Sequence, residues 1–271
     1  MLRNPFDFAR RNALITGCGS AEGIGFASAR LLAGLGARVA ITSTTSRIEE
    51  RAAELRADGA TVSAHVADLT DRGQASELVA AAHAAIGPLD ILVHAAGMVQ
   101  TGTELVSAPF AELQPEDWRR SLDLNLNTAF HTAQAILPGM VDRGYGRVVL
   151  ISSVTGPFVT VPGDAAYAAA KAAMDGMMRT LALEYGRSGI TVNSVAPGWI
   201  ATASSTPMEL AAGLSTPVGR PGTADEVASL AVYLTSETAS YVTGQSIVVD
   251  GGNIIQEPHG VDLYGASADA G

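Results

Sequence analysis

A tyrosine and a lysine, four residues apart, are the residues of this sequence with the clearest chemical potential. Tyr167 and Lys171 belong to the run Tyr-Ala-Ala-Ala-Lys, in a segment whose composition predicts a helix. Residues four apart share one helix face, which would place the ammonium beside the phenol. A neighbouring positive charge favours the phenolate and lowers the pKa of tyrosine from its usual value of about 10. The pair is therefore a candidate proton donor and acceptor near neutral pH.

A glycine-rich turn upstream suggests what this pair acts beside. The segment from Thr16 to Gly25 contains four glycines, follows a predicted strand and precedes a helix with apolar periodicity. Glycines permit a tight turn and let backbone amides approach phosphate oxygens, and the helix dipole adds positive potential. The turn predicts a dinucleotide site, and an ordinary strand-to-helix turn is the alternative.

Composition limits the classes of protein that the chain can belong to. Of its 271 residues, 47% are hydrophobic and 16% are charged, as in a soluble globular enzyme. The net charge of −10 argues against nucleic acid or an anionic membrane as a partner. The single cysteine, Cys18, excludes an intrachain disulfide and a cysteine-based metal site. We expect a cytoplasmic protein, because no apolar run reaches the roughly 18–20 residues of a membrane span and the first residues lack a signal-peptide core.

The order of strands and helices predicts the fold. Short β-branched runs, apolar enough for burial on both faces, alternate with alanine-rich helical stretches. This order is typical of an α/β protein with a single Rossmann-type, doubly wound parallel sheet of about seven strands and helices on both faces. The predicted strands are 12–16, 38–42, 61–66, 91–94, 147–151, 191–195 and 246–249, and the predicted helices are 24–35, 47–58, 72–86, 115–143, 164–187 and 224–235. We expect one domain over residues 1–271, with a substrate flap near residues 201–218 and a polar C-terminal tail.

Beyond these separate patterns, the chain resembles the short-chain dehydrogenase/reductase family in its compact, classical form. The resemblance extends over about residues 8–255 and is strongest to the 3-oxoacyl-carrier-protein reductases. The family's turn, T-G-x-x-x-G-I-G, reads here Thr16-Gly17, five residues, then Gly23-Ile24-Gly25, so it is two residues longer. His94 stands where the family's N-x-A-G motif has asparagine, and we expect a hydrogen-bonded structural histidine there. The resemblance implies hydride transfer between a nicotinamide dinucleotide and a ketone or secondary alcohol.

By the same resemblance, four residues form the catalytic set. They are Asn125, which completes W-x-x-x-x-D-x-N, Ser153, the second serine of Ile-Ser-Ser, and the pair Tyr167 and Lys171. Tyr167 would give a proton to the substrate carbonyl oxygen, and Ser153 would hydrogen-bond that oxygen. Lys171 would lower the pKa of Tyr167 and bind the nicotinamide ribose, while Asn125 would hold a water that connects Lys171 to solvent. Taken singly, these residues could instead end a strand, cap a helix or pack in the core, and Ser152 should tolerate substitution.

A larger set of residues is expected to bind the cofactor. Asp68 resembles the family's adenine-contacting aspartate, with a turn or helix cap as its alternative role. The run from Pro197 to Thr202 resembles P-G-x-x-x-T, whose isoleucine-position backbone and threonine hydroxyl hold the carboxamide. The complete expected set is Gly17, Gly19, Ser20, Gly23, Ile24, Gly25, Ser43, Thr44, Arg47, Asp68, Leu69, Ala95, Ala96, Gly97, Tyr167, Lys171, Pro197, Gly198, Ile200 and Thr202. We expect no metal site.

The end of the second predicted strand bears on the choice between NADP(H) and NAD(H). An acidic residue there would bind the ribose 2′-hydroxyl of NAD, and the sequence has none. A 2′-phosphate could instead bind the guanidinium of Arg47 and the hydroxyls of Ser43, Thr44 and Thr45. We therefore favour NADP(H), with NAD(H) as the alternative, because Glu22 would disfavour the phosphate and Arg47 could be an ordinary surface residue.

The substrate and the assembly are predicted only in class. Residues 203–218 are rich in Ser, Thr, Pro, Met and Leu and offer no anchor for a phosphate or carboxylate, which favours a neutral, fairly apolar ketone or a thioester-tethered ketone. A small-residue face at Ala166, Ala170, Ala173 and Met177 suggests, by resemblance, a homotetramer, and packing inside one chain is the alternative. Two other functions stay open: an NAD-dependent alcohol dehydrogenase of the same family, and a catalytically silent nucleotide-binding sensor. Enoyl reductases of the superfamily space tyrosine and lysine further apart, so Tyr-x-x-x-Lys argues against them.

Overall fold

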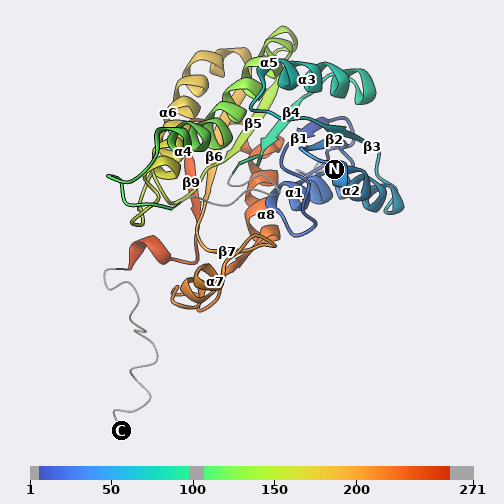
Figure 1. Ribbon diagram of the computed structural model, residues 1–271. Coiled ribbons are helices and arrows are strands. Elements are labelled where there is room, and N and C mark those ends of the chain that lie inside the picture. Colours follow the sequence, from blue (N-terminus) through green and yellow to red (C-terminus); the bar gives the residue numbers. More distant parts are fainter. Residues whose placement is uncertain (1–5, 98–106, 257–271) are drawn as a thin grey trace.

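A seven-stranded parallel sheet organises the computed structural model, which describes residues 6–97 and 107–256 (Figure 1). The strand order is β3-β2-β1-β4-β5-β6-β9, and every neighbouring pair is parallel. The strands are β1 (Asn12–Ile15), β2 (Arg38–Ser43), β3 (Val62–Val66), β4 (Ile91–His94), β5 (Gly146–Ile151), β6 (Ile190–Pro197) and β9 (Ser246–Val249). The predicted fold class is confirmed, with small shifts at the strand ends.

Helices cover both faces of the sheet, which is why its central strands are apolar on both sides. Three helices pack on one face and three on the other, each set enclosing its own hydrophobic cluster. The first set is α1 (Ile24–Gly34), α2 (Arg47–Ala57) and α8 (Ala224–Thr235), and the second is α3 (Arg72–Ile86), α5 (Thr128–Arg143) and α6 (Ala165–Tyr185). Short 3₁₀ turns occur at Gly186–Ser188, Glu237–Ala239 and Asn253–Ile255.

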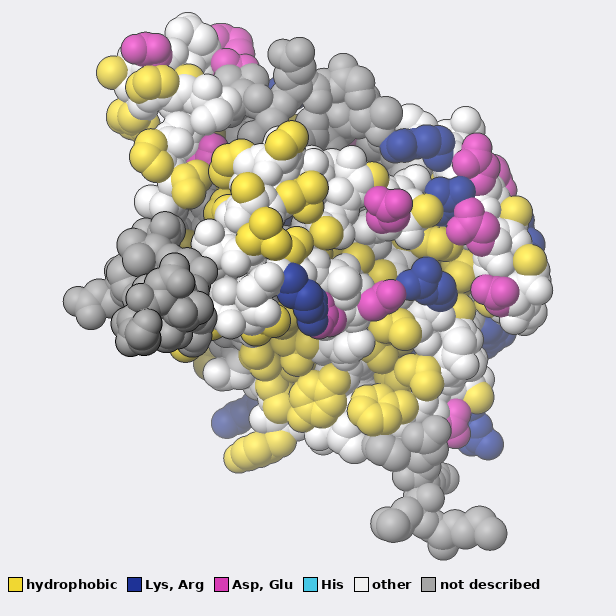
Figure 2. All heavy atoms as spheres, turned by 90° about the horizontal axis from the view of Figure 1, so that it is seen from below, with side chains coloured by type: hydrophobic (Ala, Val, Ile, Leu, Met, Phe, Trp, Pro, Cys, Tyr) yellow, Lys and Arg dark blue, Asp and Glu magenta, His cyan; other side chains and the backbone are white. Residues whose placement is uncertain are grey.

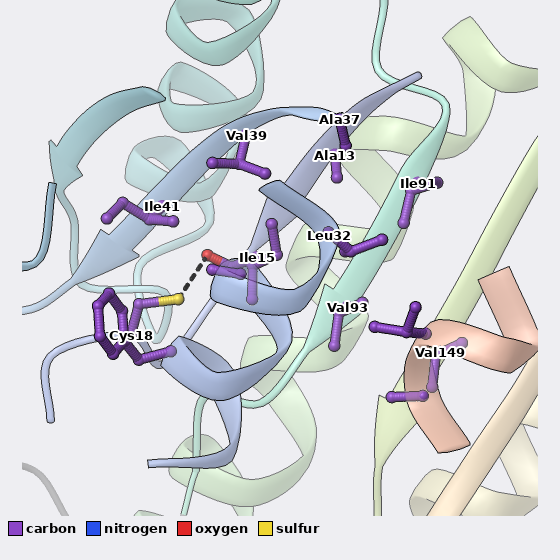
Figure 3. Close-up of a cluster of buried hydrophobic side chains, with 14 of the residues drawn as sticks. Ala13, Ile15, Cys18, Leu32, Ala37, Val39, Ile41, Ile91, Val93 and Val149 are labelled. Atoms are coloured by element: carbon purple, nitrogen blue, oxygen red, sulfur yellow. Dashed lines mark hydrogen bonds between the residues drawn. The ribbon is translucent and has the colours of Figure 1, made fainter. Parts of the chain in front are cut away.

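The core beneath the glycine turn is shown in Figure 3. Side chains of β1, β2, β4 and α1 meet there, among them Ile15, Ile41 and Leu32, all fully buried. Cys18 joins this cluster, and its thiol donates to the Ile15 carbonyl oxygen at 3.4 Å. Burial raises the pKa of the Cys18 thiol far above its ordinary value, so this side chain packs as a small apolar group.

The strand order reverses direction between β1 and β4. The chain leaves β1 toward α1 on one face and leaves β4 toward the helices on the opposite face, so the two connections part above the sheet. In open α/β sheets a crevice forms at such a point, outside the carboxyl ends of the strands. The glycine turn after β1 and residues Ala95–Gly97 after β4 therefore share one edge.

The predicted helix over residues 115–143 is not uniform. The structure resolves it into α4 (Pro115–Leu122), a π turn (Asp123–Asn127) and α5. Within it, the Thr128 N–H bonds to the Asp123 oxygen, one carbonyl further back than in an α-helix. The prediction of one regular helix was wrong because a π turn inserts one residue without changing composition or polarity. Such turns often lie at functional sites, and this one carries Asn125.

The predicted flap contains a helix of its own. Residues Ile200–Ala201 (β7) pair with Gly222–Thr223 (β8), and α7 (Pro207–Leu214) lies between them. A capping box starts α7: Glu209 N–H donates to Thr206 Oγ1 at 3.2 Å, and Thr206 N–H donates to Glu209 Oε2 at 2.7 Å. Figure 2 looks onto this end of the molecule, where hydrophobic side chains gather in the middle and charged ones lie mostly at the right. The tail beyond residue 256 lies outside the described residues.

Among residues 6–97 and 107–256, no helix is both long enough and apolar enough to cross a lipid bilayer.

Candidate active site

The glycine turn passes so close to neighbouring backbone that side chains would not fit. A Cβ on Gly17, whose φ is +72°, would lie 2.5 Å from the Ala95 oxygen, and one on Gly25 would lie 2.6 Å from the Thr16 oxygen. Gly23 is the N-cap of α1 and has no side chain that could cover the backbone amides of the first helical turn, which begins at Ile24. The turn thus forms a cradle of backbone donors beside a helix N-terminus, which fits the pyrophosphate of a dinucleotide.

At the end of β2, the polar residues predicted from the sequence gather beside the same turn. A Cβ on Gly19 would lie 3.0 Å from Ser43 Cβ and 3.4 Å from a terminal nitrogen of Arg47. Arg47 Nε donates to Thr45 Oγ1 at 3.2 Å, and Ser43 Oγ donates to the Thr45 oxygen at 2.8 Å. Thr44 and Glu22 are exposed, and the Glu22 N–H donates to Ser20 Oγ at 3.3 Å. The structure therefore brings Gly19, Ser43 and Arg47 together at one edge of the cradle.

Asp68 closes the turn that follows β3. Its Oδ1 accepts from Thr70 Oγ1 at 2.7 Å and from the Thr70 N–H at 3.0 Å. The N-cap of α3 is Asp71, which accepts from the Gln74 N–H at 2.9 Å, so the alternative of a helix cap is wrong for Asp68 and the turn is right. The adjoining Leu69 is buried.

Ser153, Tyr167 and Lys171 come together just beyond the carboxyl end of β5. Tyr167 and Lys171 lie one turn apart near the start of α6, and Ser153 follows β5 by two residues. The Ser153 and Tyr167 side chains are hydrogen-bonded. Lys171 Nζ donates to the Ile151 oxygen at 2.9 Å and lies 5.7 Å from the centroid of the Tyr167 ring. Lys171 is only 3% exposed, so its carbon stem and its charge are both held inside the protein.

The pKa values of this pair do not follow the expectation from the sequence. Desolvation raises the pKa of Tyr167 to about 12, although the residue keeps some exposure and its hydrogen bond with Ser153 acts in the opposite direction. Burial lowers the pKa of Lys171 to about 8, and the Asp175 carboxylate opposes this shift. The predicted lowering of the tyrosine pKa is therefore wrong for the protein's own groups, because removing the phenol from water outweighs the interactions that favour the phenolate.

Asn125 lies in the π turn, 2% exposed. Its Nδ2 donates to the Ser121 oxygen at 3.1 Å. A Cβ on Gly97 would lie 3.0 Å from Asn125 Oδ1 and 3.6 Å from Lys171 Nζ, so the backbone after β4 passes beside both side chains. The four candidate catalytic residues thus lie at the edge of the sheet where a doubly wound fold forms its crevice, and we call this edge, bordered by Ala95, Ala96 and Gly97, the groove.

The run from Pro197 to Thr202 continues from the end of β6, beyond the carboxyl edge of the sheet. Gly198 is required by close packing, because its Cβ would lie 2.6 Å from Asp250 Cβ. Ser205, which the sequence did not single out, joins the two groups expected to hold the carboxamide. Its Oγ donates to the Ile200 oxygen at 2.9 Å and accepts from the Thr202 N–H at 2.9 Å.

Two features set Lys171 apart. It is the only lysine among the 271 residues, a fact of the sequence alone. One turn further along α6 lies Asp175, 1% exposed, whose Oδ1 accepts from Ser194 Oγ at 2.8 Å. Asp175 Oδ2 is buried with no hydrogen-bond partner among the described residues. The only ε-ammonium of the chain therefore shares a buried helix face with a carboxylate.

In the part of the chain that the structure describes, no group of three or more His, Cys, Asp or Glu side chains lies close enough together to hold a metal ion.

Comparison with known proteins places this site in a family. A family sequence model described as "Enoyl-(Acyl carrier protein) reductase" matches residues 17–253. A solved short-chain dehydrogenase/reductase from Serratia marcescens superposes with a TM-score of 0.83 at 32% identity, covering 91% of this chain and 98% of that one. The chain belongs to the short-chain dehydrogenase/reductase family. This short-chain dehydrogenase/reductase is accordingly an oxidoreductase that uses a nicotinamide nucleotide and acts on alcohol or ketone groups.

Curated relatives of this dehydrogenase/reductase carry different names. "Oxidoreductase UcpA" of Salmonella typhimurium is 36% identical over 261 residues, covering 91% of this chain and 95% of the relative. "Gluconate 5-dehydrogenase" of Gluconobacter oxydans is 34% identical over 254 residues, covering 91% of this chain and 96% of the relative. Of these two names, only the second specifies a substrate.

Asp175→Asn is expected to lower the pKa of Lys171 further below its value of about 8, because the carboxylate opposes the effect of burial. Since Lys171 is the only lysine, [¹⁵N]lysine labels one side chain, and NMR can titrate that ammonium alone. Ser194→Ala is the matched control: it removes the hydrogen bond to Asp175 but keeps the carboxylate. An unchanged titration in Asp175→Asn would show that the carboxylate does not act on Lys171.

Proposed function

We propose that this chain is an NADP(H)-dependent ketone reductase that works reversibly as a secondary-alcohol dehydrogenase, with 3-oxoacyl thioesters among the ketones it takes. The observation that carries the proposal is the meeting of Asn125, Ser153, Tyr167 and Lys171 at the end of the groove beside Gly97. Carbonyl reduction needs a proton donor, a group that holds the oxygen and a charge that assists the donor. This cluster supplies all three.

Each residue has a role that its surroundings support. Tyr167 donates the proton to the carbonyl oxygen in reduction, and its raised pKa keeps the phenol protonated for that step. Ser153, already hydrogen-bonded to Tyr167, holds the same oxygen as negative charge develops. The nicotinamide, when bound, supplies or accepts the hydride at the substrate carbon.

Lys171 and Asn125 form the second half of the site. The Lys171 ammonium, fixed by the Ile151 oxygen, favours the phenolate that remains after proton transfer and offers further donors to the ribose hydroxyls. Asn125 lies within reach of the same backbone and orients a water through which Lys171 recovers a proton. Tyr-x-x-x-Lys spacing favours carbonyl chemistry over enoyl reduction, despite the name of the matching family model.

The preference for NADP(H) is supported by Arg47 at the end of β2. Its terminal nitrogen lies beside Gly19 and close to Ser43, at the edge of the cradle where the adenosine ribose would lie. No acidic residue ends β2, and Glu22 is exposed on the turn. A guanidinium with neighbouring hydroxyls suits a phosphate dianion better than a ribose hydroxyl.

Arg47→Ala is expected to raise the KM for NADPH roughly tenfold, the effect of losing one charged hydrogen bond at a partly exposed site, and to leave the KM for NADH nearly unchanged. The check is steady-state kinetics with both nucleotides. Arg56→Ala provides the control, because Arg56 is an exposed arginine in the last turn of the same helix. Equal changes in the two KM values would contradict the preference and favour the NAD-dependent alternative.

The experiment that tests the function is a spectrophotometric screen of neutral ketones, 3-oxoacyl thioesters and sugar acids with NADPH and NADH. Reduction of neutral ketones or 3-oxoacyl thioesters with NADPH supports the proposal. Turnover only of sugar acids with NADH would favour an activity like that in the name of the Gluconobacter oxydans relative. Nucleotide binding without turnover of any compound would favour the silent sensor.

We also propose a homotetramer. Of the small-residue face, Ala166 and Ala170 are buried and serve internal packing, whereas Ala173 is exposed and Met177 is partly exposed. Exposed apolar side chains, Phe130 and Val141 on α5 and Leu183 on α6, further support contact with another copy. Light scattering of the purified protein tests the assembly.

A further inference from the structure

His94 ends β4 at the centre of the molecule and is 0% exposed. Its ring has a partner on each side. Nδ1 lies 3.2 Å from Thr16 Oγ1, at the start of the glycine turn. Nε2 lies 3.2 Å from Thr128 Oγ1, at the end of the π turn. One imidazole therefore joins two segments that both line the groove.

The hydrogen bonds around the ring assign its proton. Thr128 Oγ1 donates its only hydrogen to the Leu124 oxygen at 2.9 Å, so it must accept from an Nε2–H of His94. Thr16 Oγ1 accepts from the N–H groups of Ala95 at 3.1 Å and Ala96 at 3.0 Å. Those two bonds fill its lone pairs, so the Thr16 hydroxyl donates to Nδ1. Both ends give the same answer: a neutral ring with the proton on Nε2.

The ring also stays uncharged for electrostatic reasons. Burial, reinforced by the nearby Lys171 ammonium, lowers the pKa of His94 to about 3. A protonated ring would need acceptors on both sides, and Thr16 Oγ1 is already saturated.

The two threonines that flank His94 each hold a backbone segment of the proposed site. On one side, Thr16 holds Ala95 and Ala96, which form the groove wall before Gly97. On the other, the Thr128 N–H bonds to the Asp123 oxygen because of the π turn, and the Thr128 hydroxyl supplies a donor to Leu124, the residue before Asn125. Asparagine in place of His94 is too short to reach both threonines.

We propose that His94 is a positioning residue that, in its neutral Nε2–H form, ties the glycine turn to the π turn and so sets Asn125 against the groove wall. The expected effect of His94 on turnover rests on the proposed function. The expected effects on nucleotide binding and on the position of the ring proton do not require a known substrate. His94 touches neither Tyr167 nor Ser153 in any hydrogen bond described above, so it acts through Thr16 and Thr128.

Two substitutions cut the two ends separately. His94→Asn places an amide oxygen where Nδ1 lies and keeps the bond from Thr16, but loses the donor to Thr128. It should lower kcat roughly tenfold, as for one buried hydrogen bond, with the Kd for NADPH nearly unchanged. His94→Gln places an amide N–H where Nε2 lies and keeps Thr128, but loses the acceptor for Thr16. It should raise the Kd for NADPH roughly tenfold with kcat largely retained.

Controls on the partner threonine make the test independent of histidine. Thr128→Val removes the contact with His94 and also the bond from the Thr128 hydroxyl to the Leu124 oxygen, so it should lose at least as much kcat as His94→Asn. The double variant should lose no more than Thr128→Val alone, because the contact between residues 94 and 128 is already gone. Thr128→Ser keeps the hydroxyl and should retain the rate. A merely structural histidine would lower the Tm of both His94 variants without separating kcat from Kd.

NMR of [¹⁵N]histidine-labelled protein reads the proton directly. The expected spectrum shows His94 protonated on Nε2 and unchanged between about pH 5 and about pH 9, across which an ordinary histidine titrates. A proton on Nδ1, or His94→Asn and His94→Gln changing kcat and Kd in the same ratio, would overturn the proposal. If the unsubstituted protein reduces no ketone, the proposed function fails, and the NMR and Kd measurements still decide the role of His94.

Discussion

Tyr167→Phe is expected to lower kcat by about 10³-fold, within the range that a positioned general acid contributes, while the Kd for NADPH stays nearly constant. The substitution removes one oxygen from a ring that is otherwise kept in place on α6. Ser153 then loses its interaction with the phenol but keeps the bond from the Thr155 N–H at 3.0 Å, and the carbonyl oxygen loses its proton source. Because Lys171 is fixed by the Ile151 oxygen and not by the phenol, the lysine should stay in position.

The measurement for Tyr167→Phe is single-turnover reduction of a ketone at saturating NADPH, beside fluorescence titration of NADPH binding. Ser152→Ala is the matched control, since Ser152 is the buried serine next to Ser153 and its Oγ donates to the Lys171 backbone oxygen at 3.5 Å, not to either reacting side chain. That variant should keep most of the rate. A Tyr167→Phe enzyme that also kept most of its rate would remove the tyrosine from the role of acid.

Lys171→Met is expected to lower kcat/KM by about 10²-fold or more and, unlike Tyr167→Phe, to weaken NADPH binding as well. Methionine matches the length of the buried stem but lacks the ammonium that bonds to the Ile151 oxygen. In the unsubstituted enzyme the ammonium persists below its pKa of about 8 and is lost as the pH rises through that value. NADPH affinity and kcat/KM should therefore decline above about pH 8, and Lys171→Met should lack that step.

Stopped-flow binding and kcat/KM measured across the pH range test this expectation. Lys171→Arg serves as the control: it keeps a positive charge that does not titrate in this range, so the step should vanish while some NADPH affinity returns. If Lys171→Met retained the decline near pH 8, another group would be responsible for it.

Much of the fold was predictable because its determinants are local in sequence. Apolar β-branched runs predict strands buried on both faces, and the glycines of the Thr16 to Gly25 turn predict where backbone must pass close to backbone. The candidate catalytic residues came from the resemblance to the family, and the structure brings Asn125 and Lys171 to the same backbone at Gly97. What the residues do to one another was less predictable.

The missed features depend on three-dimensional neighbours. In the π turn one backbone hydrogen bond reaches back to a carbonyl one residue further than in an α-helix, and no residue type in 123–127 predicts this change. The partners of His94 lie 78 and 34 residues away along the chain. The direction of the Tyr167 pKa depends on how deeply the phenol is enclosed, and only tertiary packing decides that.

One consequence follows from the placement of the only lysine. Amine-directed reagents ordinarily scatter over many surface lysines, whereas here the sole ε-amine lies in the groove and sixteen arginines supply every other side-chain cation except histidine. Its lowered pKa leaves a larger fraction as the nucleophilic free amine near neutral pH. Apart from the chain's α-amine, amine-directed acylation or reductive alkylation has a single target, and the 3% exposure of Lys171 shields it in the folded protein. Such reagents therefore report opening of this site: labelling of Lys171 should be slow in the folded enzyme, slower still with bound nucleotide, and fast after unfolding.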